Sequence, residues 1–238
     1  MKERFRLKET FVWITADEKR YVEVAKEEIT RQRKELERFV RWHPYFLVTL
    51  ERYQMDEVEL VGARKKEEPP KIVRKMVDAA STFGIGPMAA VAGTLAEFAV
   101  EAMRDAGATY AMVDNGGDIA LINDREVLVG IYAGESSFSN RIALRIKPSP
   151  SLVGICTSSG SVGHSISFGT ADAATVISGS ASLSDAAATA LCNAVTDTPA
   201  IKAAFRAIDH VAGIEGALII YKDVLAIWGN VPEIVKTK

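Results

Sequence analysis

The stretch YAMVDNGGDIALIN, residues 110–123, decides the fold class of this chain. Its two apolar runs, 110–113 and 119–122, flank the polar sequence DNGG, in which Asn and paired glycines are typical of a tight turn between two β-strands. Short apolar runs of the same kind continue at 127–132, 142–146, 152–157 and 174–178. The sequence therefore predicts a sheet of short, mostly antiparallel strands.

Helical patterns lie on both sides of these strands. Apolar residues at helical spacing predict a charged surface helix over 16–39 and a helix over 87–106 with Pro87 in its first turn. The other expected elements are a strand or short hairpin at 3–14, short helices at 45–53 and 72–80, helices at 183–195 and 199–212, and a strand hairpin at 216–228. Ser182 or Ser184 is the expected N-cap of the 183–195 helix. Helices intermixed with antiparallel strands predict an α+β fold rather than a doubly wound sheet.

Length and charge distribution bear on domain organisation. Of the first 80 residues 35 are charged, against 25 of the remaining 158, and the charged segment 54–70 ends in two prolines. A chain of 238 residues is long enough to bury a substantial core. We expect a single domain over 1–238, with a charged strand–helix portion at 1–70 and a core at 71–238.

The stretch from 148 to 201 contains no Lys or Arg. Its only acidic residues are Asp172, Asp185 and Asp197, and His164 is its only histidine. A stretch so poor in charge is mostly buried or lines a site, so its few titratable groups are candidates for function.

Composition excludes several classes of protein. With 29 basic and 31 acidic residues, the net charge of −2 provides no attraction to nucleic acid or to an anionic membrane. The charged N-terminus lacks the apolar segment of a signal peptide, and no run of 18 apolar residues occurs. Cys156 and Cys192 lack metal-ligand spacing and are expected to be buried thiols. We expect a cytoplasmic protein that binds neither nucleic acid nor membranes.

The loop TSSGSVGHS at 157–165 follows the apolar run LVGIC. Its hydroxyls, glycines and successive backbone N–H groups suit phosphate binding, and His164 suits phosphate binding or proton transfer. The alternative is a polar loop with a structural histidine. A serine-hydrolase triad is not indicated, because the chain has no G-x-S-x-G element and spacing identifies no acid partner.

Asp185 and Thr189 stand four residues apart in a predicted helix, so they share one face. Carboxylate and hydroxyl oxygens are hard ligands that suit Mg²⁺ better than Zn²⁺. The alternative for Asp185 is an ordinary role near a helix start, where negative charge is favourable.

In order and spacing these elements resemble the ApbE-type FAD:protein FMN transferases. That family carries a G-G-D-[IL] element, a later T-S-G loop, a histidine shortly beyond, a Thr-Val strand and an A-D-A-x-A-T-A helix. The matching residues here are Gly116-Gly117-Asp118-Ile119, Thr157-Ser158-Ser159-Gly160, His164, Thr175-Val176 and the heptapeptide SDAAATA at 184–190. The chain resembles the superfamily over roughly residues 85–230, and especially a shorter cytoplasmic branch.

The resemblance implies an ApbE-like α+β domain that binds a flavin nucleotide in the 71–238 core. It implies Mg²⁺ binding by Asp185 and Thr189, and catalysis by His164 or Asp118 as general base. The residues implied in FAD binding are Gly116, Gly117, Asp118, Thr157, Ser158, Ser159, Gly160 and Thr175. The implied reaction cleaves the FAD pyrophosphate, releases AMP and passes FMN to a Ser or Thr hydroxyl of an acceptor protein, or to water.

Other hypotheses stay open at this point. The family continues its histidine as H-I-I-D-P-x-T-G, whereas this chain reads HSISFGT at 164–170, and the first 80 residues have no clear counterpart. One alternative is a non-catalytic FAD- or nucleotide-binding or assembly protein of the same fold, and another is an enzyme for a different phosphorylated substrate. The small-residue helices at 87–106 and 183–195 would also suit packing against a second subunit in a homo-oligomer.

Overall fold

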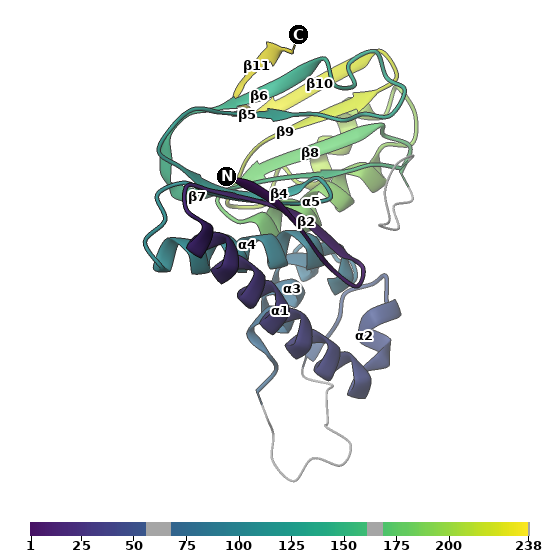
Figure 1. Ribbon diagram of the computed structural model, residues 1–238. Helices are drawn as coiled ribbons and strands as arrows, with labels where there is room; N and C mark the ends of the chain where they lie inside the picture. Colours follow the sequence, from purple (N-terminus) through teal and green to yellow (C-terminus); the bar gives the residue numbers. More distant parts are fainter. Residues whose placement is uncertain (56–67, 161–168, 238) are drawn as a thin grey trace.

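The computed structural model describes residues 1–55, 68–160 and 169–237, and a large antiparallel sheet lies at its centre (Figure 1). From edge to edge, its eight strands are β1 (Lys2–Leu7), β2 (Thr10–Ala16), β3 (Ala111–Asn115), β4 (Asp118–Asn123), β7 (Ser149–Ser158), β8 (Ala173–Ser178), β9 (Ile214–Tyr221) and β10 (Val224–Gly229). Every neighbouring pair in this sheet is antiparallel. The predicted α+β class with mostly antiparallel strands is confirmed.

Residues 110–123 form the predicted hairpin. β3 and β4 pair in register from Ala111 with Ile122 to Asn115 with Asp118. Gly116 and Gly117 make the turn with φ angles of 73° and 104°, a conformation that glycine adopts at little cost. The turn therefore places Asp118 at the first position of β4.

A smaller sheet packs on one face of the large one. It consists of β11 (Glu233–Lys236), β6 (Ile142–Ile146) and β5 (Val127–Gly130), in that order. Apolar side chains from both sheets fill the space between them, among them Leu121, Leu144, Ile155 and Leu218. β11 was not predicted, because its four residues pair with a strand almost ninety residues earlier and carry no local turn signal.

Three helices cover the other face of the large sheet, α1 (Lys19–Trp42), α4 (Val91–Asp105) and α5 (Ala181–Ala194) (Figure 1). Ile14 of the N-terminal hairpin lies in the same buried cluster as Val100 of α4 and Ala188 of α5. β2 also pairs with β3, so the first strands of the chain share both the sheet and the core with its later part.

A third buried cluster lies beyond this layer, around α2 (Pro44–Val48), α3 (Lys71–Ser81) and the 3₁₀ turn η2 (Pro87–Ala90). Phe46, Ile72, Met76 and Leu95 are among its members. The helix expected over 87–106 thus begins with a 3₁₀ turn at Pro87 and continues as α4.

Two expectations about the C-terminal half are corrected. Ser180, and neither Ser182 nor Ser184, is the N-cap of α5, with its Oγ accepting a hydrogen bond from the Leu183 N–H at 3.3 Å. Instead of one helix over 199–212 the chain forms the short α6 (Ile201–Ala204) and the 3₁₀ turn η3 (Phe205–Ala207). These two short turns bury Ile201, Ala204 and Phe205 without a continuous helix.

Candidate functional site

The G-G-D turn is held against the start of α4. The Asp114 carboxylate accepts a hydrogen bond from the Gly117 N–H at 2.9 Å, which closes the turn. Asn115 donates through Nδ2 to the carbonyl of Ala92, in the first turn of α4, at 3.1 Å. These contacts fix the position of Asp118, which is only 8% exposed.

The end of β7 meets the same turn. The Thr157 N–H donates to the carbonyl of Gly117 at 3.2 Å, and the Thr157 and Thr175 hydroxyls share a hydrogen bond of 2.8 Å between β7 and β8. The Ser158 Oγ is buried and has no hydrogen-bond partner within the described residues. A buried hydroxyl without a partner is costly, which makes this atom a candidate for a polar contact with a ligand.

Asp185 and Thr189 lie one turn apart on α5, and both side chains are buried. The Asp185 carboxylate accepts a hydrogen bond from the Gly93 N–H at 2.8 Å, so it lies at the positive N-terminal end of α4. The two helices touch so closely there that a Cβ on Gly93 would lie 2.3 Å from the Ala181 carbonyl oxygen. Glycine at this position is therefore a requirement of the Asp185 contact.

The two buried aspartates, Asp118 and Asp185, have raised pKa values. Burial raises the pKa of Asp185 to about 7, partly offset by the N–H groups of Gly93 and Ala92. Burial and then the Asp185 charge hold the pKa of Asp118 well above its ordinary value. Within the described residues no Lys or Arg nitrogen lies within 4.0 Å of either carboxylate. The fold therefore confines two acidic groups without a cationic side chain between them.

Cys156 belongs to the same group of buried side chains. It pairs with Asp118 in the β4–β7 register, and its Sγ donates to the Ala181 carbonyl at 3.3 Å. Burial, followed by the charges of Asp118 and Asp185, raises the pKa of the Cys156 thiol. Cys156 and Cys192 are both buried, as predicted, and the raised pKa of Cys156 keeps its thiol unreactive.

The donors around Asp185 fit Mg²⁺ as the resident ion. Mg²⁺ is usually held by one or two carboxylates, with the remaining positions filled by water and substrate phosphates. Asp185, Thr189 and Asp118 supply oxygen donors of this kind, and the mutual repulsion of the two carboxylates favours a cation between them. Among the described residues no group of three or more His, Cys, Asp and Glu side chains could hold a metal ion, so an ion here would need water and substrate oxygens as further ligands.

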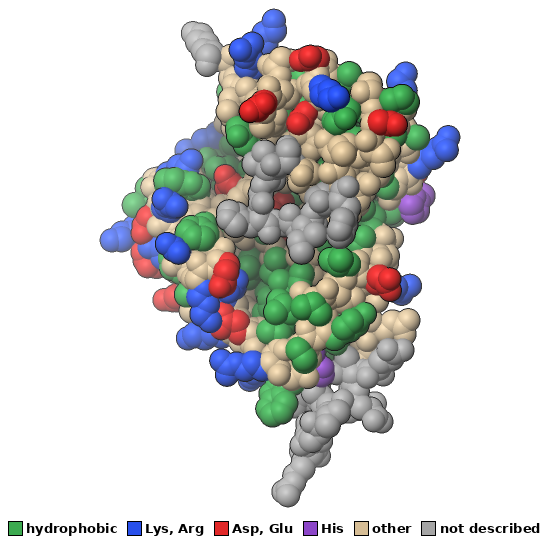
Figure 2. Space-filling model, turned by 90° about the vertical axis from the view of Figure 1, so that its right-hand side faces the viewer, with side chains coloured by type: hydrophobic (Ala, Val, Ile, Leu, Met, Phe, Trp, Pro, Cys, Tyr) green, Lys and Arg blue, Asp and Glu red, His purple; other side chains and the backbone are tan. Residues whose placement is uncertain are grey.

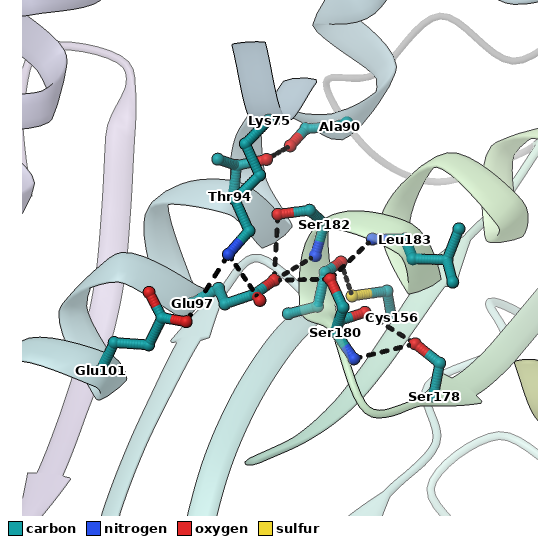
Figure 3. Close-up of polar contacts among 11 residues, drawn as sticks. Lys75, Ala90, Thr94, Glu97, Glu101, Cys156, Ser178, Ser180, Ser182 and Leu183 are labelled. Carbon is teal, nitrogen blue, oxygen red and sulfur yellow. Dashed lines mark hydrogen bonds and ion pairs between the residues drawn. The ribbon is translucent and has the colours of Figure 1, made fainter. Parts of the chain in front are cut away.

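A third buried carboxylate, Glu97 of α4, escaped the sequence prediction (Figure 3). Its Oε2 accepts hydrogen bonds from the Ser182 N–H at 2.8 Å, the Ser182 hydroxyl at 3.0 Å and the Ser180 hydroxyl at 2.9 Å. Its Oε1 forms an ion pair with Lys75 of α3 at 2.8 Å, and Lys75 also lies 3.6 Å from Glu101. Glu97 thus joins α3 and α4 to the first turn of α5.

The sequence did contain a signal for Glu97. The residue lies four positions after Gly93 and three before Val100, both of which face the buried side of α4. A charged residue on the apolar face of a helix needs a buried partner, and this was the clue that could have identified it.

The predicted site residues are therefore brought together only in part. The G-G-D turn, Thr157, Thr175 and the start of α4 form one hydrogen-bonded group, and Asp185 joins it through Gly93. Gly160 donates its N–H to the Ala171 carbonyl at 2.9 Å, just beyond β7. His164 lies outside the described residues.

A protein-family model described as "AbpE bacteria" matches residues 2–210. The chain belongs to this ApbE-like family. The match starts in the N-terminal hairpin, so the similarity extends well before residue 85, where the recognisable motifs begin.

Relatives of this ApbE-like chain cover it from end to end. The UPF0280 protein of Methanosarcina acetivorans is 51% identical over 239 residues, which cover 100% of this chain and 90% of that protein. The UPF0280 protein of Methanococcoides burtonii is 48% identical over 237 residues, covering 99% and 95%.

Solved structures share the ApbE-like fold. The flavinyl transferase ApbE of Pseudomonas stutzeri, in its apo form, is similar with a TM-score of 0.59 and 14% identity, covering 98% of this chain and 95% of that one. The flavin transferase ApbE of Vibrio cholerae is similar with a TM-score of 0.52 and 15% identity, covering 98% and 97%. At these identities the likeness concerns the fold alone. Within the described residues, no helix has the length and apolar character needed to cross a membrane.

Proposed function

We propose that this chain is a Mg²⁺-dependent flavin-nucleotide enzyme that cleaves the pyrophosphate of FAD, releases AMP and passes FMN to a protein Ser or Thr hydroxyl or to water. The observation that carries the proposal is the pair of buried carboxylates, Asp118 and Asp185, which lie beside the G-G-D turn without a basic partner in the described part of the chain. Such a pair suits a divalent cation that accompanies a phosphate substrate.

Each residue group has a distinct proposed role. Asp185 and Thr189 hold Mg²⁺, with Asp118 beside them. When bound, Mg²⁺ offsets the negative charge that develops on the phosphate oxygens. The FAD phosphates lie against Gly116, Gly117 and the 157–160 segment, where the Ser158 hydroxyl lacks a partner among the described residues. Thr175 fixes Thr157 through their shared hydrogen bond.

The reaction is a single phosphoryl transfer. The acceptor oxygen attacks the phosphorus on the FMN side, a new P–O bond forms, and the pyrophosphate bond breaks so that AMP leaves with the bridging oxygen. His164 or Asp118 takes the proton of the attacking hydroxyl as general base. The raised pKa of Asp118 brings this carboxyl closer to the working pH, which suits it to accept and release a proton.

The test is to incubate the purified chain with FAD and Mg²⁺ and to measure AMP and FMN by liquid chromatography. AMP release is expected to depend on Mg²⁺ and to fall at least about 100-fold in Asp185→Ala. Asp197→Ala is the matched control, because Asp197 comes from the same charge-poor stretch but is exposed, and this variant should keep the activity.

Two results would contradict the proposal. No AMP with any hydroxyl acceptor or water would exclude the reaction, and FAD retained without turnover in native mass spectrometry would instead favour the non-catalytic binding protein. Release of AMP that is equal in Asp185→Ala and in the unmodified chain would exclude the assigned metal site.

A further inference from the structure

The surface formed by residues 42–50 (WHPYFLVTL), at the end of α1 and along α2, is exposed and apolar. The exposed fractions of five large side chains there run from 52% to 74%, for Trp42, Tyr45, Leu47, Val48 and Leu50. They make up five of the twelve exposed large hydrophobic residues in the described part of the chain, gathered within nine positions. Figure 2 shows hydrophobic side chains collected on the face of the molecule that carries α2.

Buried contacts hold the backbone of this surface in place. Phe46 is fully buried and packs edge-on against Phe39 and Tyr53, with ring centroids 5.2 and 5.0 Å apart. The Leu50 carbonyl accepts a hydrogen bond from the Gly86 N–H at 2.9 Å. A Cβ on Gly86 would lie 2.0 Å from the Thr49 carbonyl oxygen, so η2 holds this segment in close contact. The exposed side chains therefore belong to a packed element.

The apolar area of the 42–50 surface is comparable to the area that one partner buries in a protein–protein interface. Five side chains of this size and exposure present on the order of 500 Å² of apolar area. That lies in the upper part of the range for the largest patch on a monomer, and such patches often mark interaction sites. It amounts to most of the roughly 800 Å² that each partner buries in a standard interface.

The charges around the surface indicate which partner it fits. Residues 42–50 contain no Lys, Arg, Asp or Glu, so two copies can meet there without burying a charge. Arg41 precedes the stretch and Glu51 follows it, both are exposed, and neither has an ion-pair partner within the described residues. In a two-fold contact residue i meets residue j and j meets i, so Arg41 can pair with Glu51 of the partner subunit on both sides.

We infer that the 42–50 surface is the interface of a homodimer in which two copies pack related by a two-fold axis. The helices at 87–106 and 183–195, whose small residues had suggested subunit contacts, are used within the chain, because α4 and α5 pack on each other through Gly93 and Ala181. This inference stands independently of the flavin chemistry, since it involves none of the residues assigned to it.

The test is sedimentation velocity of the full chain over a range of micromolar concentrations. The expected result is a particle of about twice 25.8 kDa, with a dissociation constant that Val48→Glu raises at least about tenfold. Leu128→Glu is the matched control, because Leu128 is 56% exposed on β5, away from this surface, and should leave the dimer intact. A monomer at all concentrations, or a dimer that survives Val48→Glu, would overturn the inference.

A charge exchange tests the two-fold arrangement itself. Arg41→Glu should weaken the dimer, and the double variant Arg41→Glu/Glu51→Arg should restore it, because it rebuilds both ion pairs with reversed sign. Thermal unfolding followed by circular dichroism verifies that every variant is folded. Failure of the double variant to restore the dimer would overturn the proposed pairing, whatever the outcome of the AMP assay.

Discussion

Two groups of buried carboxylates lie near the contact between α4 and α5. One is Glu97 and the other is the pair Asp118 and Asp185, and the two groups differ in their hydrogen-bond and ion-pair partners. Glu97 accepts three hydrogen bonds from Ser180 and Ser182 and forms an ion pair with Lys75. Asp118 and Asp185 receive backbone and thiol donors but repel each other, and no basic side chain in the described residues neutralises them.

The difference separates a structural role from a functional one. A buried charge with complete partners stabilises one arrangement of helices, whereas a buried charge without a counter-ion destabilises the apo protein. A pair of buried carboxylates without a counter-ion is expected where a ligand supplies the missing positive charge. We therefore interpret Glu97 as structural and Asp118 and Asp185 as the proposed cation site.

The largest effect on stability is expected from removing Glu97, the carboxylate whose hydrogen-bond and ion-pair partners are complete. Glu97→Ala removes the 2.8 Å ion pair of Lys75 and leaves the donors of Ser180 and Ser182 without their acceptor, and should lower the free energy of unfolding by about 3 kcal/mol. Urea unfolding measures it. Glu101→Ala, which removes only the 3.6 Å contact of a more exposed carboxylate, is the control and should cost less than about 1 kcal/mol. Equal losses of stability in Glu97→Ala and Glu101→Ala would contradict the structural role of Glu97.

A smaller loss of stability is expected from Gly93→Ala, because Gly93 lies where α4 contacts Ala181 and Asp185 of α5. The added methyl group meets the Ala181 carbonyl and the Asp185 Cβ, so α4 and α5 must separate at a cost of about 2 kcal/mol. The same shift weakens the Gly93–Asp185 hydrogen bond, so Mg²⁺-dependent AMP release should also decline. Gly130→Ala is the control, because a Cβ there meets no atom within 4 Å. Unchanged stability in Gly93→Ala would contradict the close contact.

Replacing Asp118 by a neutral residue should raise the stability of the protein, whereas the two preceding substitutions lower it. Because burial raises the pKa of Asp118 in the folded protein, the ionised form is penalised, so wild-type stability falls as pH rises from the ordinary aspartate pKa of 3.8 toward the raised value. Asp118→Asn should therefore stabilise the apo protein at neutral pH and leave its stability unchanged at pH well below 3.8. Thermal unfolding across pH measures this. A stabilisation that does not vanish in acid would contradict the electrostatic cause.

The smallest effect is expected at Cys156. Cys156→Ala should cost about 1 kcal/mol, because it removes a small buried group and its contact with the Ala181 carbonyl. In the native protein the thiol should resist iodoacetamide, since burial and the two aspartates raise its pKa. Mass spectrometry after labelling tests this, and the same reagent in denaturant is the control. Rapid labelling of Cys156 in the native state would show that the aspartates are more accessible than the structure indicates.

The parts of the fold that sequence predicted are those specified by neighbouring residues. The β3–β4 hairpin follows from paired glycines between apolar runs, and α5 brings Asp185 and Thr189 to one face through helical spacing alone. The cap of α5 was predicted wrongly by sequence. Ser180, Ser182 and Ser184 are all good caps locally, and the choice depends on Glu97, 83 residues away from Ser180.

The amino-acid sequence by itself determined the strand and helix pattern, the glycine turn before Asp118, the charge-poor stretch and the order of the motifs. These properties are local, since each depends on residues within a few positions of one another. Only the tertiary structure decided that Glu97 meets Lys75, that Gly93 admits Asp185 to the end of α4, and that the N-terminal hairpin enters the main sheet. Such contacts join distant segments, and their energy depends on burial and charge that exist only once the chain is packed.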